Sequence, residues 1–226
     1  MMILRTFSEK IKTIFHKYSH AWVLLYACIY MPWFAYLERT VTTNYYVIHS
    51  VFDDYIPFCE YFIVPYLMWF FYIAATLMYF FFTDKKGFYK LTALMFSGMT
   101  LFLLICTVFP NGLNLRPIVF RHDNLFVDMV RRLYLTDTPT NVLPSLHVYN
   151  SICCYLAIAD SRKLQHNKLV QNGAFVLTTL IVLSTMFLKQ HSVVDVIAGF
   201  VMAYFIYQLV YHPEKERAPK LARQSI

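Results

Sequence analysis

The sequence predicts an all-α integral membrane protein, built as a bundle of six transmembrane helices. Of the 226 residues, 58% are hydrophobic and only 15% are charged, whereas a soluble domain is about half apolar and about a quarter charged. The apolar residues also gather into six long stretches separated by short polar segments. An apolar stretch of about 17–25 residues spans a bilayer as a helix.

The predicted spans are, in order, Ala21–Leu37, Tyr61–Phe82, Leu91–Phe109, Ser145–Ala159, Leu169–Leu188 and Val193–Tyr211. The fourth is short, but its start is well marked. Ser145 is a good helix N-cap, and a proline lies just before it. No convincing small-residue cleavage site follows the first span, so we expect an uncleaved anchor. The aromatic segment 45–57 is too short to cross and is expected at the membrane interface.

Charge predicts the domain organisation and the orientation. We expect a cytoplasmic arm over residues 1–20, a membrane catalytic domain over 21–212 and a basic cytoplasmic tail over 213–226. With six spans, 14 of the 20 Lys and Arg residues fall on one side, and positive charge marks the cytoplasmic face. Both termini are therefore predicted to be cytoplasmic, with the 110–143 loop on the extracytoplasmic face of the plasma or cell membrane. These flanking charges explain the net charge of +7 without a nucleic-acid partner.

Two histidines beside predicted spans are the candidate catalytic residues. His147 opens the fourth span, and His191 lies in the turn before the sixth, four residues ahead of Asp195. Ionisable groups next to membrane segments are costly and usually functional. Side chains four residues apart on a helix share a face, so Asp195 can orient His191 and raise its basicity for nucleophilic or base chemistry.

Alternating spans place both histidines at one membrane face, where the long loop also delivers Arg116. A guanidinium, two imidazoles and a carboxylate suit a tetrahedral oxyanion, because Arg binds phosphate through its planar donors. One His can attack phosphorus while the other protonates the leaving oxygen. The helix start at Ser145 adds free backbone N–H groups for phosphate oxygens.

At these residues the chain resembles the type 2 phosphatidic acid phosphatase (PAP2) superfamily. The signatures of that family are Lys-x6-Arg-Pro, Pro-Ser-Gly-His and Ser-Arg-x5-His-x3-Asp. The residues that match them are Arg116-Pro117, then Pro144-Ser145-Leu146-His147 with Leu in place of Gly, then Ser184, His191 and Asp195. The order and the six spans also match, so the resemblance covers roughly Tyr61 to Tyr211.

The resemblance implies a role for each matched residue. His191 would be the nucleophile that forms a phosphohistidine, Asp195 would orient it, and His147 would be the general acid. The matched positions Arg116, Ser145 and Ser184 would bind the substrate phosphate. Such enzymes need no metal and no other cofactor.

Two positions depart from the signatures. Phe109 stands where the first signature has Lys, and Thr185 stands where the third has Arg, so two of three phosphate-binding cations are missing. Lys189 is the predicted replacement because it lies two residues before His191. Other candidates are the loop residues Arg121, Arg131 and Arg132.

The favoured function is a membrane lipid phosphatase that hydrolyses phospholipid or polyprenyl phosphate monoesters through a phosphohistidine. The partners are then a lipid substrate, whose tail stays in the bilayer, and the bilayer itself. The reduced signature set is also similar to the sphingomyelin-synthase and inositol-phosphorylceramide-synthase branch, whose members are phosphotransferases that move a phospho-headgroup onto a lipid alcohol. A third hypothesis is an inactive lipid-binding protein, because two cations are absent. The sequence leaves the oligomeric state open.

Overall fold

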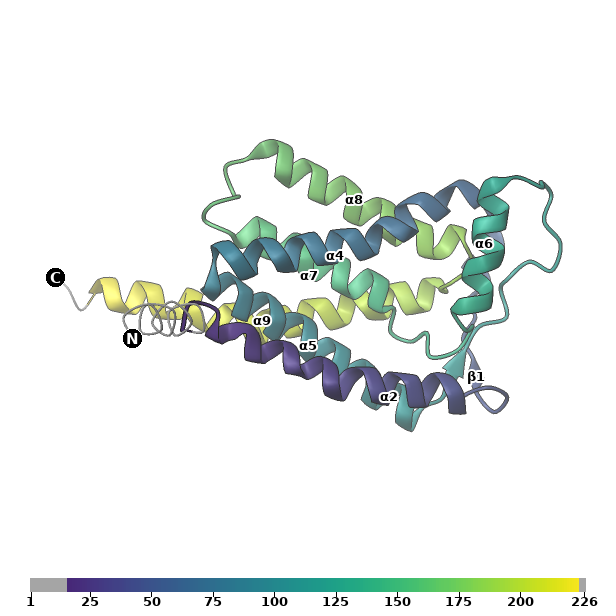
Figure 1. The fold of residues 1–226 in the computed structure, drawn as a ribbon, viewed down its shortest axis with the longest axis horizontal. Coiled ribbons are helices and arrows are strands. Elements are labelled where there is room, and N and C mark those ends of the chain that lie inside the picture. Colours follow the sequence, from purple (N-terminus) through teal and green to yellow (C-terminus); the bar gives the residue numbers. More distant parts are fainter. Residues whose placement is uncertain (1–15, 224–226) are drawn as a thin grey trace, which may run out of the picture.

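The computed structural model describes residues 16–223, with side chains described as far as Tyr211. Residues 1–15 of the predicted arm and the side chains of the predicted tail lie outside that description. The described chain is almost wholly helical (Figure 1). Its longer elements are η1 (Ser19–Tyr26) running into α2 (Ala27–Thr40), η2 (Glu60–Phe62) running into α4 (Ile63–Thr83), α5 (Lys85–Val108), α6 (Leu125–Thr136), α7 (Leu146–Asp160), α8 (Lys168–Phe187) and α9 (Val193–Arg223).

Five helices in the described part of the chain are long and apolar enough to cross a membrane. They are Ser19–Thr40, Glu60–Thr83, Lys85–Val108, Lys168–Phe187 and Val193–Tyr211, and they coincide with five of the six predicted spans. The remaining prediction corresponds to α7, which has 15 residues and falls short of the length that a bilayer requires. A count of six spans therefore stays a prediction.

Helix α7 is short because it occupies the centre of the bundle. It packs against α4, α5, α8 and α9, and residues on several of its faces are buried, among them Tyr149, Asn150, Cys153 and Ala157. Protein and not lipid surrounds it, so its length need not match the bilayer. The predicted N-cap is confirmed, since the Ser145 hydroxyl accepts a hydrogen bond from the Val148 N–H.

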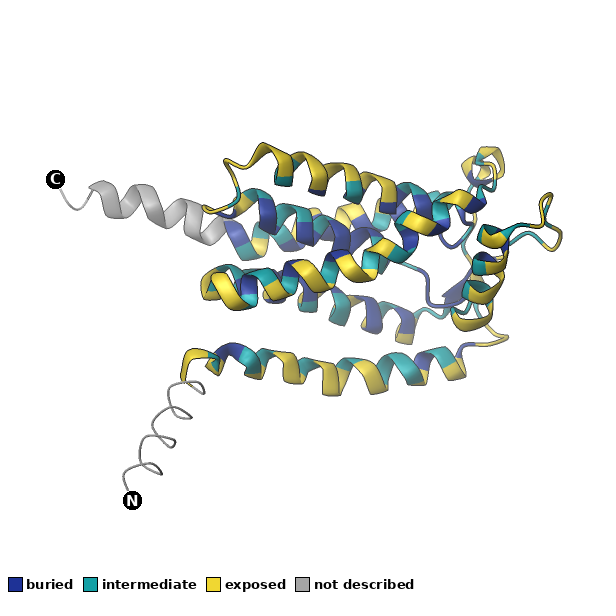
Figure 2. Cartoon of the chain, turned by 45° about the horizontal axis from the view of Figure 1, so that its top comes forward, coloured by how far each residue is buried: buried dark blue, intermediate teal, exposed yellow. Residues whose placement is uncertain are grey.

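Apolar side chains face both inward and outward along the bundle. The largest core cluster includes Phe80, Leu94, Tyr149 and Ile181, all at most 1% exposed. The outer faces also carry large exposed hydrophobic residues (Figure 2), for example Phe71, Met78, Val176, Phe205 and Leu209. A soluble monomer rarely exposes so much contiguous apolar surface, so these faces fit contact with lipid tails.

The end of the bundle opposite to the start of α2 and the end of α9 carries the irregular structure (Figure 1). There β1 (Tyr46–Val47) pairs in parallel with β2 (Asn111–Gly112), and α3 (Val51–Tyr55) follows β1. The described chain is nearly all-α, as predicted, and this pair of two-residue strands is the exception.

The 110–143 segment was predicted as a loop, but it contains the amphipathic helix α6. The Asn124 side chain caps it by accepting from the Val127 N–H at 3.0 Å. Val127 and Val130 are buried on one face, while Arg131 and Arg132 are exposed on the other. This helix lies across the end of the bundle (Figure 1) and forms part of the wall of the site.

Candidate active site

The turn between α8 and α9 presents His191 to the site. After α8 ends at Phe187, Lys189 adopts a left-handed backbone conformation with φ of 54°. The N–H groups of Gln190 and His191 then both donate to the Thr185 carbonyl, at 2.9 and 3.0 Å. This tight turn directs the side chains of Gln190 and His191 into a cavity.

Asp195 both caps α9 and faces the His191 ring. Ser192 Oγ accepts from the Val194 N–H at 3.1 Å, and Asp195 Oδ2 accepts from the Ser192 N–H at 2.9 Å, which together form a helix-start motif. The same Oδ2 lies 3.4 Å from His191 Nδ1, within ion-pair distance but without the alignment of a hydrogen bond. Asp195 is fully buried, so its carboxylate acts on the imidazole without competition from bulk water.

A second buried carboxylate fixes this helix start. Asp53, on α3, is 2% exposed. Its Oδ2 accepts from Ser192 Oγ at 2.6 Å and its Oδ1 accepts from the Val193 N–H at 2.8 Å. Negative charge at a helix N-terminus is stabilising, so α3 anchors the turn that carries His191.

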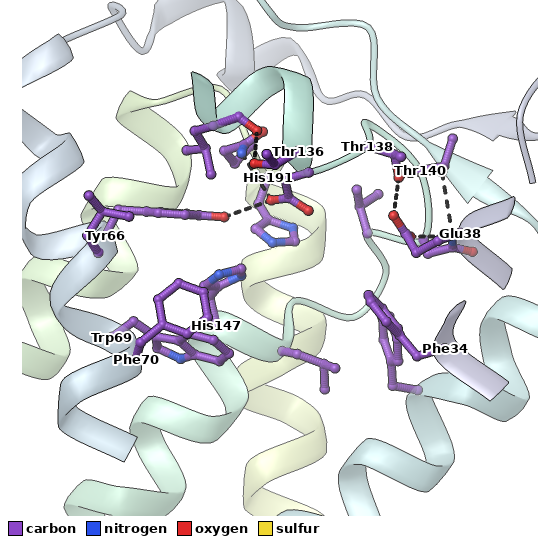
Figure 3. Close-up of a pocket in the computed structure, with 18 of the residues that line it drawn as sticks. Phe34, Glu38, Tyr66, Trp69, Phe70, Thr136, Thr138, Thr140, His147 and His191 are labelled. Carbon is purple, nitrogen blue, oxygen red and sulfur yellow. Dashed lines mark hydrogen bonds between the residues drawn. The ribbon is translucent and has the colours of Figure 1, made fainter. Parts of the chain in front are cut away.

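His147 faces His191 across the cavity. It lies in the first turn of α7 and packs between aromatic rings of α4, with its ring centroid 4.6 Å from that of Tyr66 and 4.3 Å from that of Trp69 (Figure 3). The centroids of the two imidazoles are 5.7 Å apart. The predicted pairing of these histidines at one end of the bundle therefore holds in the structure.

The starts of α7 and α9 approach closely, which sets this spacing. The Ser145 N–H donates to the Asp195 carbonyl at 3.1 Å. A Cβ at Gly199 would lie 3.1 Å from the Ser145 carbonyl oxygen and 3.2 Å from Val148 Cβ. Glycine at this position thus allows the two helices that bear the histidines to touch.

The cavity between the histidines and α2 has a volume of about 740 Å³. Its apolar part is lined by side chains of α2, α4 and α5, namely Tyr30, Met31, Phe34, Leu67, Phe70 and Phe102. Its polar part is lined by Glu38, Asp137, Thr138, Thr140, Asn141, His147, Gln190 and His191. An apolar cleft with a few convergent polar groups is the usual form of a ligand site.

Arg116 lies behind this wall and does not line the cavity. Its guanidinium donates to Gln190 Oε1 at 2.6 Å and to the Tyr134 carbonyl at 3.2 Å, and it stacks on the Tyr134 ring at 4.5 Å. Gln190 in turn donates to Asp137 Oδ2 at 3.1 Å. Burial lowers the pKa of the Arg116 guanidinium, while the Asp137 carboxylate opposes this shift. Arg116, which was predicted to bind phosphate, therefore contacts a residue of the cavity wall, Gln190, and not the cavity itself.

Lys189 points away from the cavity. Its ammonium donates to the Asp53 carbonyl at 2.7 Å and to the Ile56 carbonyl at 2.5 Å. Burial lowers the pKa of this ammonium, and the charges of Asp53 and Asp54 oppose the shift. The structure therefore does not bring Lys189, the predicted phosphate ligand, to the cavity, because the turn that presents His191 directs Lys189 toward α3.

The two predicted serines also lie outside the cavity. Ser145 caps α7, and Ser184 Oγ donates to the Ile181 carbonyl at 2.6 Å. Both are fully buried. Their hydroxyls hold helices in place, so the structure does not support a phosphate contact for either side chain.

Neither position of the missing cations lines the cavity, although the Thr185 carbonyl accepts from the His191 N–H. Phe109 stacks on Tyr46 with centroids 4.6 Å apart, and Thr185 Oγ1 donates to the Val182 carbonyl at 2.8 Å. Among the described residues that line the cavity, the one Lys or Arg is Arg132 of α6. Sequence analysis named it only as one of three further candidates, in a segment that was expected to be a loop.

Sequence analysis also missed Glu38, Tyr66, Trp69 and Gln190, whereas the segment 137–141 was expected as a turn where a substrate headgroup would rest. Tyr66 donates to Asp137 Oδ2 at 3.0 Å, so α4, α6 and the His191 turn share one network. The spacing of Tyr66 and Trp69 on α4 was a detectable signal, because residues three apart on a helix share a face. Glu38 was detectable as a carboxylate that directly follows an apolar span.

Comparison with known proteins gives a match to a protein-family model over residues 116–218. No curated protein and no solved structure matches the chain. The matched segment begins at Arg116, covers α6, α7 and α8, and contains His147, His191 and Asp195. It is somewhat less than half of the chain. Over residues 116–218, the protein is similar to the PAP2 superfamily.

Proposed function

We propose that this protein is an integral membrane phosphatase that hydrolyses lipid phosphate monoesters through a phosphohistidine at His191. The observation that carries the proposal is the pair of imidazoles, 5.7 Å apart on one cavity, with His191 beside the buried Asp195. The similarity of residues 116–218 to the PAP2 superfamily supports it independently.

The chemistry follows from the placement of the two rings. Asp195 faces His191 Nδ1, which leaves Nε2 to attack phosphorus and lets the carboxylate stabilise the cationic ring that results. His147 donates a proton to the leaving lipid oxygen as the P–O bond breaks. His147, now neutral, accepts a proton from water as the water oxygen attacks the phosphohistidine. Inorganic phosphate leaves, and both imidazoles return to their starting states.

The rest of the cavity supports a lipid as substrate. Apolar side chains of α2, α4 and α5 line it beneath the histidines, among them Met31, Phe34, Phe70 and Phe102. Five helices can span the bilayer, so a lipid tail can remain in an apolar environment while its phosphate reaches His191.

We place both termini in the cytoplasm and the site on the extracytoplasmic face of the plasma or cell membrane. The start of α2 and the end of α9 lie at one end of the bundle (Figure 1), which supports an even number of crossings. Counting the enclosed helix α7 as a crossing gives six. The basic residues Lys85, Lys90, Lys163 and Lys168 flank helices at the end proposed to be cytoplasmic.

A second candidate is a phosphotransferase that moves a phospho-headgroup onto a lipid alcohol. The observation that favours it is the charge of the cavity wall, which carries Arg132 but also the carboxylates Glu38 and Asp137. A phosphodiester has one negative charge fewer than a fully ionised monoester, so it needs fewer cations. The arrangement of His147, His191 and Asp195 argues against the third hypothesis, an inactive lipid-binding protein.

The deciding experiment measures phosphate release and headgroup transfer in parallel, over a panel of lipid phosphates, with purified protein in vesicles. His191→Ala should abolish the reaction. His122→Ala is the matched control, because His122 is exposed at the same end of the bundle and pairs with Glu60 outside the cavity. Phosphate release supports hydrolysis, and transfer without release supports the second candidate. A wild-type protein that does neither, on any lipid, contradicts both.

A further inference from the structure

Glu38 is a carboxylate in the cavity wall that no Lys or Arg contacts directly in the described part of the chain. It lies in the last turn of α2, across the cavity from the histidines (Figure 3). Its Oε2 accepts from Thr138 Oγ1 at 2.5 Å and its Oε1 accepts from Asn141 Nδ2 at 2.8 Å. Both donors are neutral, and Glu38 forms no ion pair within the described part of the chain. A carboxylate has about four acceptor sites, so its charge and part of its accepting capacity remain free.

The other carboxylate of the cavity is balanced. Asp137 accepts from Gln190, and the same Gln190 accepts from the Arg116 guanidinium. These contacts place one positive charge close to the negative charge of Asp137. Two other charged lining residues, of opposite sign, have no hydrogen-bonded link to an opposite charge within the described residues. They are Arg132 on α6 and Glu38 on α2.

Asn141 adds an unsatisfied acceptor beside Glu38. It is 6% exposed, it lines the cavity, and its Oδ1 has no hydrogen-bond partner. Its backbone adopts the left-handed conformation, with φ of 55°. Buried polar atoms are nearly always paired. This oxygen is itself shielded from the cavity, so the group that faces a ligand is the Glu38 carboxylate, which Asn141 Nδ2 holds in place. A carboxylate without an ion pair on the wall of a cavity points to a ligand that carries positive charge.

We propose that Glu38, held in place by Thr138 and Asn141, forms a subsite for an ammonium group on the lipid phosphate substrate. The proposal rests on the proposed function and names its substrate class. The phosphate lies toward His191 and Arg132, and the ammonium lies toward Glu38. The rings of Tyr30 and Phe34 line the same side of the cavity, and aromatic faces attract cations.

Two kinds of lipid carry this chemistry. One is a zwitterionic phosphodiester, with the ammonium in the headgroup beyond the phosphate. The other is a long-chain amino-alcohol phosphate, with the ammonium on the lipid backbone. The first would be a substrate for headgroup transfer and the second for hydrolysis, so the test includes both.

The test compares matched lipids with and without the ammonium group. The diester pair is phosphatidylethanolamine against phosphatidylglycerol, and the monoester pair is a sphingoid-base phosphate against phosphatidic acid. Glu38→Gln should lower kcat/KM for the preferred ammonium lipid about ten- to a hundredfold, the range of one charge-assisted contact. Activity on the ammonium-free lipid should change by less than about threefold, because the phosphate contacts are untouched.

The matched control is Glu60→Gln, which removes a carboxylate that is 5% exposed at the same end of the bundle but outside the cavity. This variant should lower kcat/KM for both lipids of a pair equally, or for neither. Equal losses in both members with Glu38→Gln would overturn the subsite, as would a wild-type protein with no preference for the ammonium lipid.

Binding separates this inference from the proposed function. Affinity for vesicles of each lipid is measured with His191→Ala, which cannot form a phosphoenzyme. A preference for the ammonium lipid that disappears in the double variant with Glu38→Gln supports the subsite, whatever the chemistry. Equal affinity for both lipids in His191→Ala refutes it, even if wild-type protein releases phosphate.

Discussion

Replacing Arg132 by methionine should separate two accounts of how the phosphate is held. Arg132 is the one Lys or Arg that lines the cavity among the described residues, whereas Lys189 binds the carbonyls of Asp53 and Ile56. A hydrogen bond to a charged group is worth about 1.5–3 kcal/mol. If Arg132 contacts phosphate in the transition state, its loss should slow turnover about ten- to a hundredfold.

Lys189→Met should behave differently. Its ammonium stabilises the junction of α3 with the α8–α9 turn, so we expect a lower melting temperature and a rate per folded molecule within about threefold of wild type. The contact energy of about 1.5–3 kcal/mol should then be lost from the free energy of unfolding, and the activation free energy of the reaction should stay nearly the same.

The assay is kcat/KM on the best lipid phosphate, with the folded fraction of each variant measured by thermal unfolding in detergent. Arg131→Met is the control, because Arg131 is the neighbouring arginine on α6 and pairs with Asp123 and Asp128 at the surface. Full activity in Arg132→Met together with a catalytic loss in Lys189→Met would refute this assignment and restore the prediction made from the sequence.

Three further predictions follow from the geometry. Asp195→Asn keeps an acceptor for the Ser192 N–H but removes the charge beside His191, so kcat should fall at least about tenfold with little change in melting temperature; an unchanged rate would make the pair purely structural. Gly199→Val should cost about 1–3 kcal/mol of unfolding free energy by overpacking and should lower activity, and a stable, active variant would contradict the close approach of α7 and α9. A cysteine at exposed position Ile118, in a chain without native cysteines, should react with an impermeant thiol reagent in intact cells; reaction only after permeabilisation would reverse the proposed orientation.

The fold was largely predictable because bilayer spans have a strong signal. Five predicted spans coincide with helices, since an apolar run of that length has few alternatives. Helix α6 was missed because its run of apolar residues is short and is interrupted by Arg131 and Arg132. The β1–β2 pairing joins segments about 65 residues apart, and no local pattern encodes such a contact.

The grouping of the candidate catalytic residues was predictable because it depends on local spacing. His191 and Asp195 are four residues apart, and Ser145 caps the helix that bears His147. Which cation lines the cavity was not predictable, because the positions of these side chains depend on tertiary contacts. The left-handed turn at Lys189 reverses the direction expected for its side chain. Arg132 reaches the cavity only because α6 lies across the end of the bundle.

The central claim is that His191 is the nucleophile, and trapping the phosphoenzyme tests it most directly. Wild-type protein is mixed with a lipid radiolabelled at phosphorus, quenched with denaturant at neutral pH within milliseconds, and digested. We predict a label that acid removes and alkali does not, carried by the peptide that contains His191 and absent from His191→Ala. Label that persists in His191→Ala, or that maps to His147, would contradict the account.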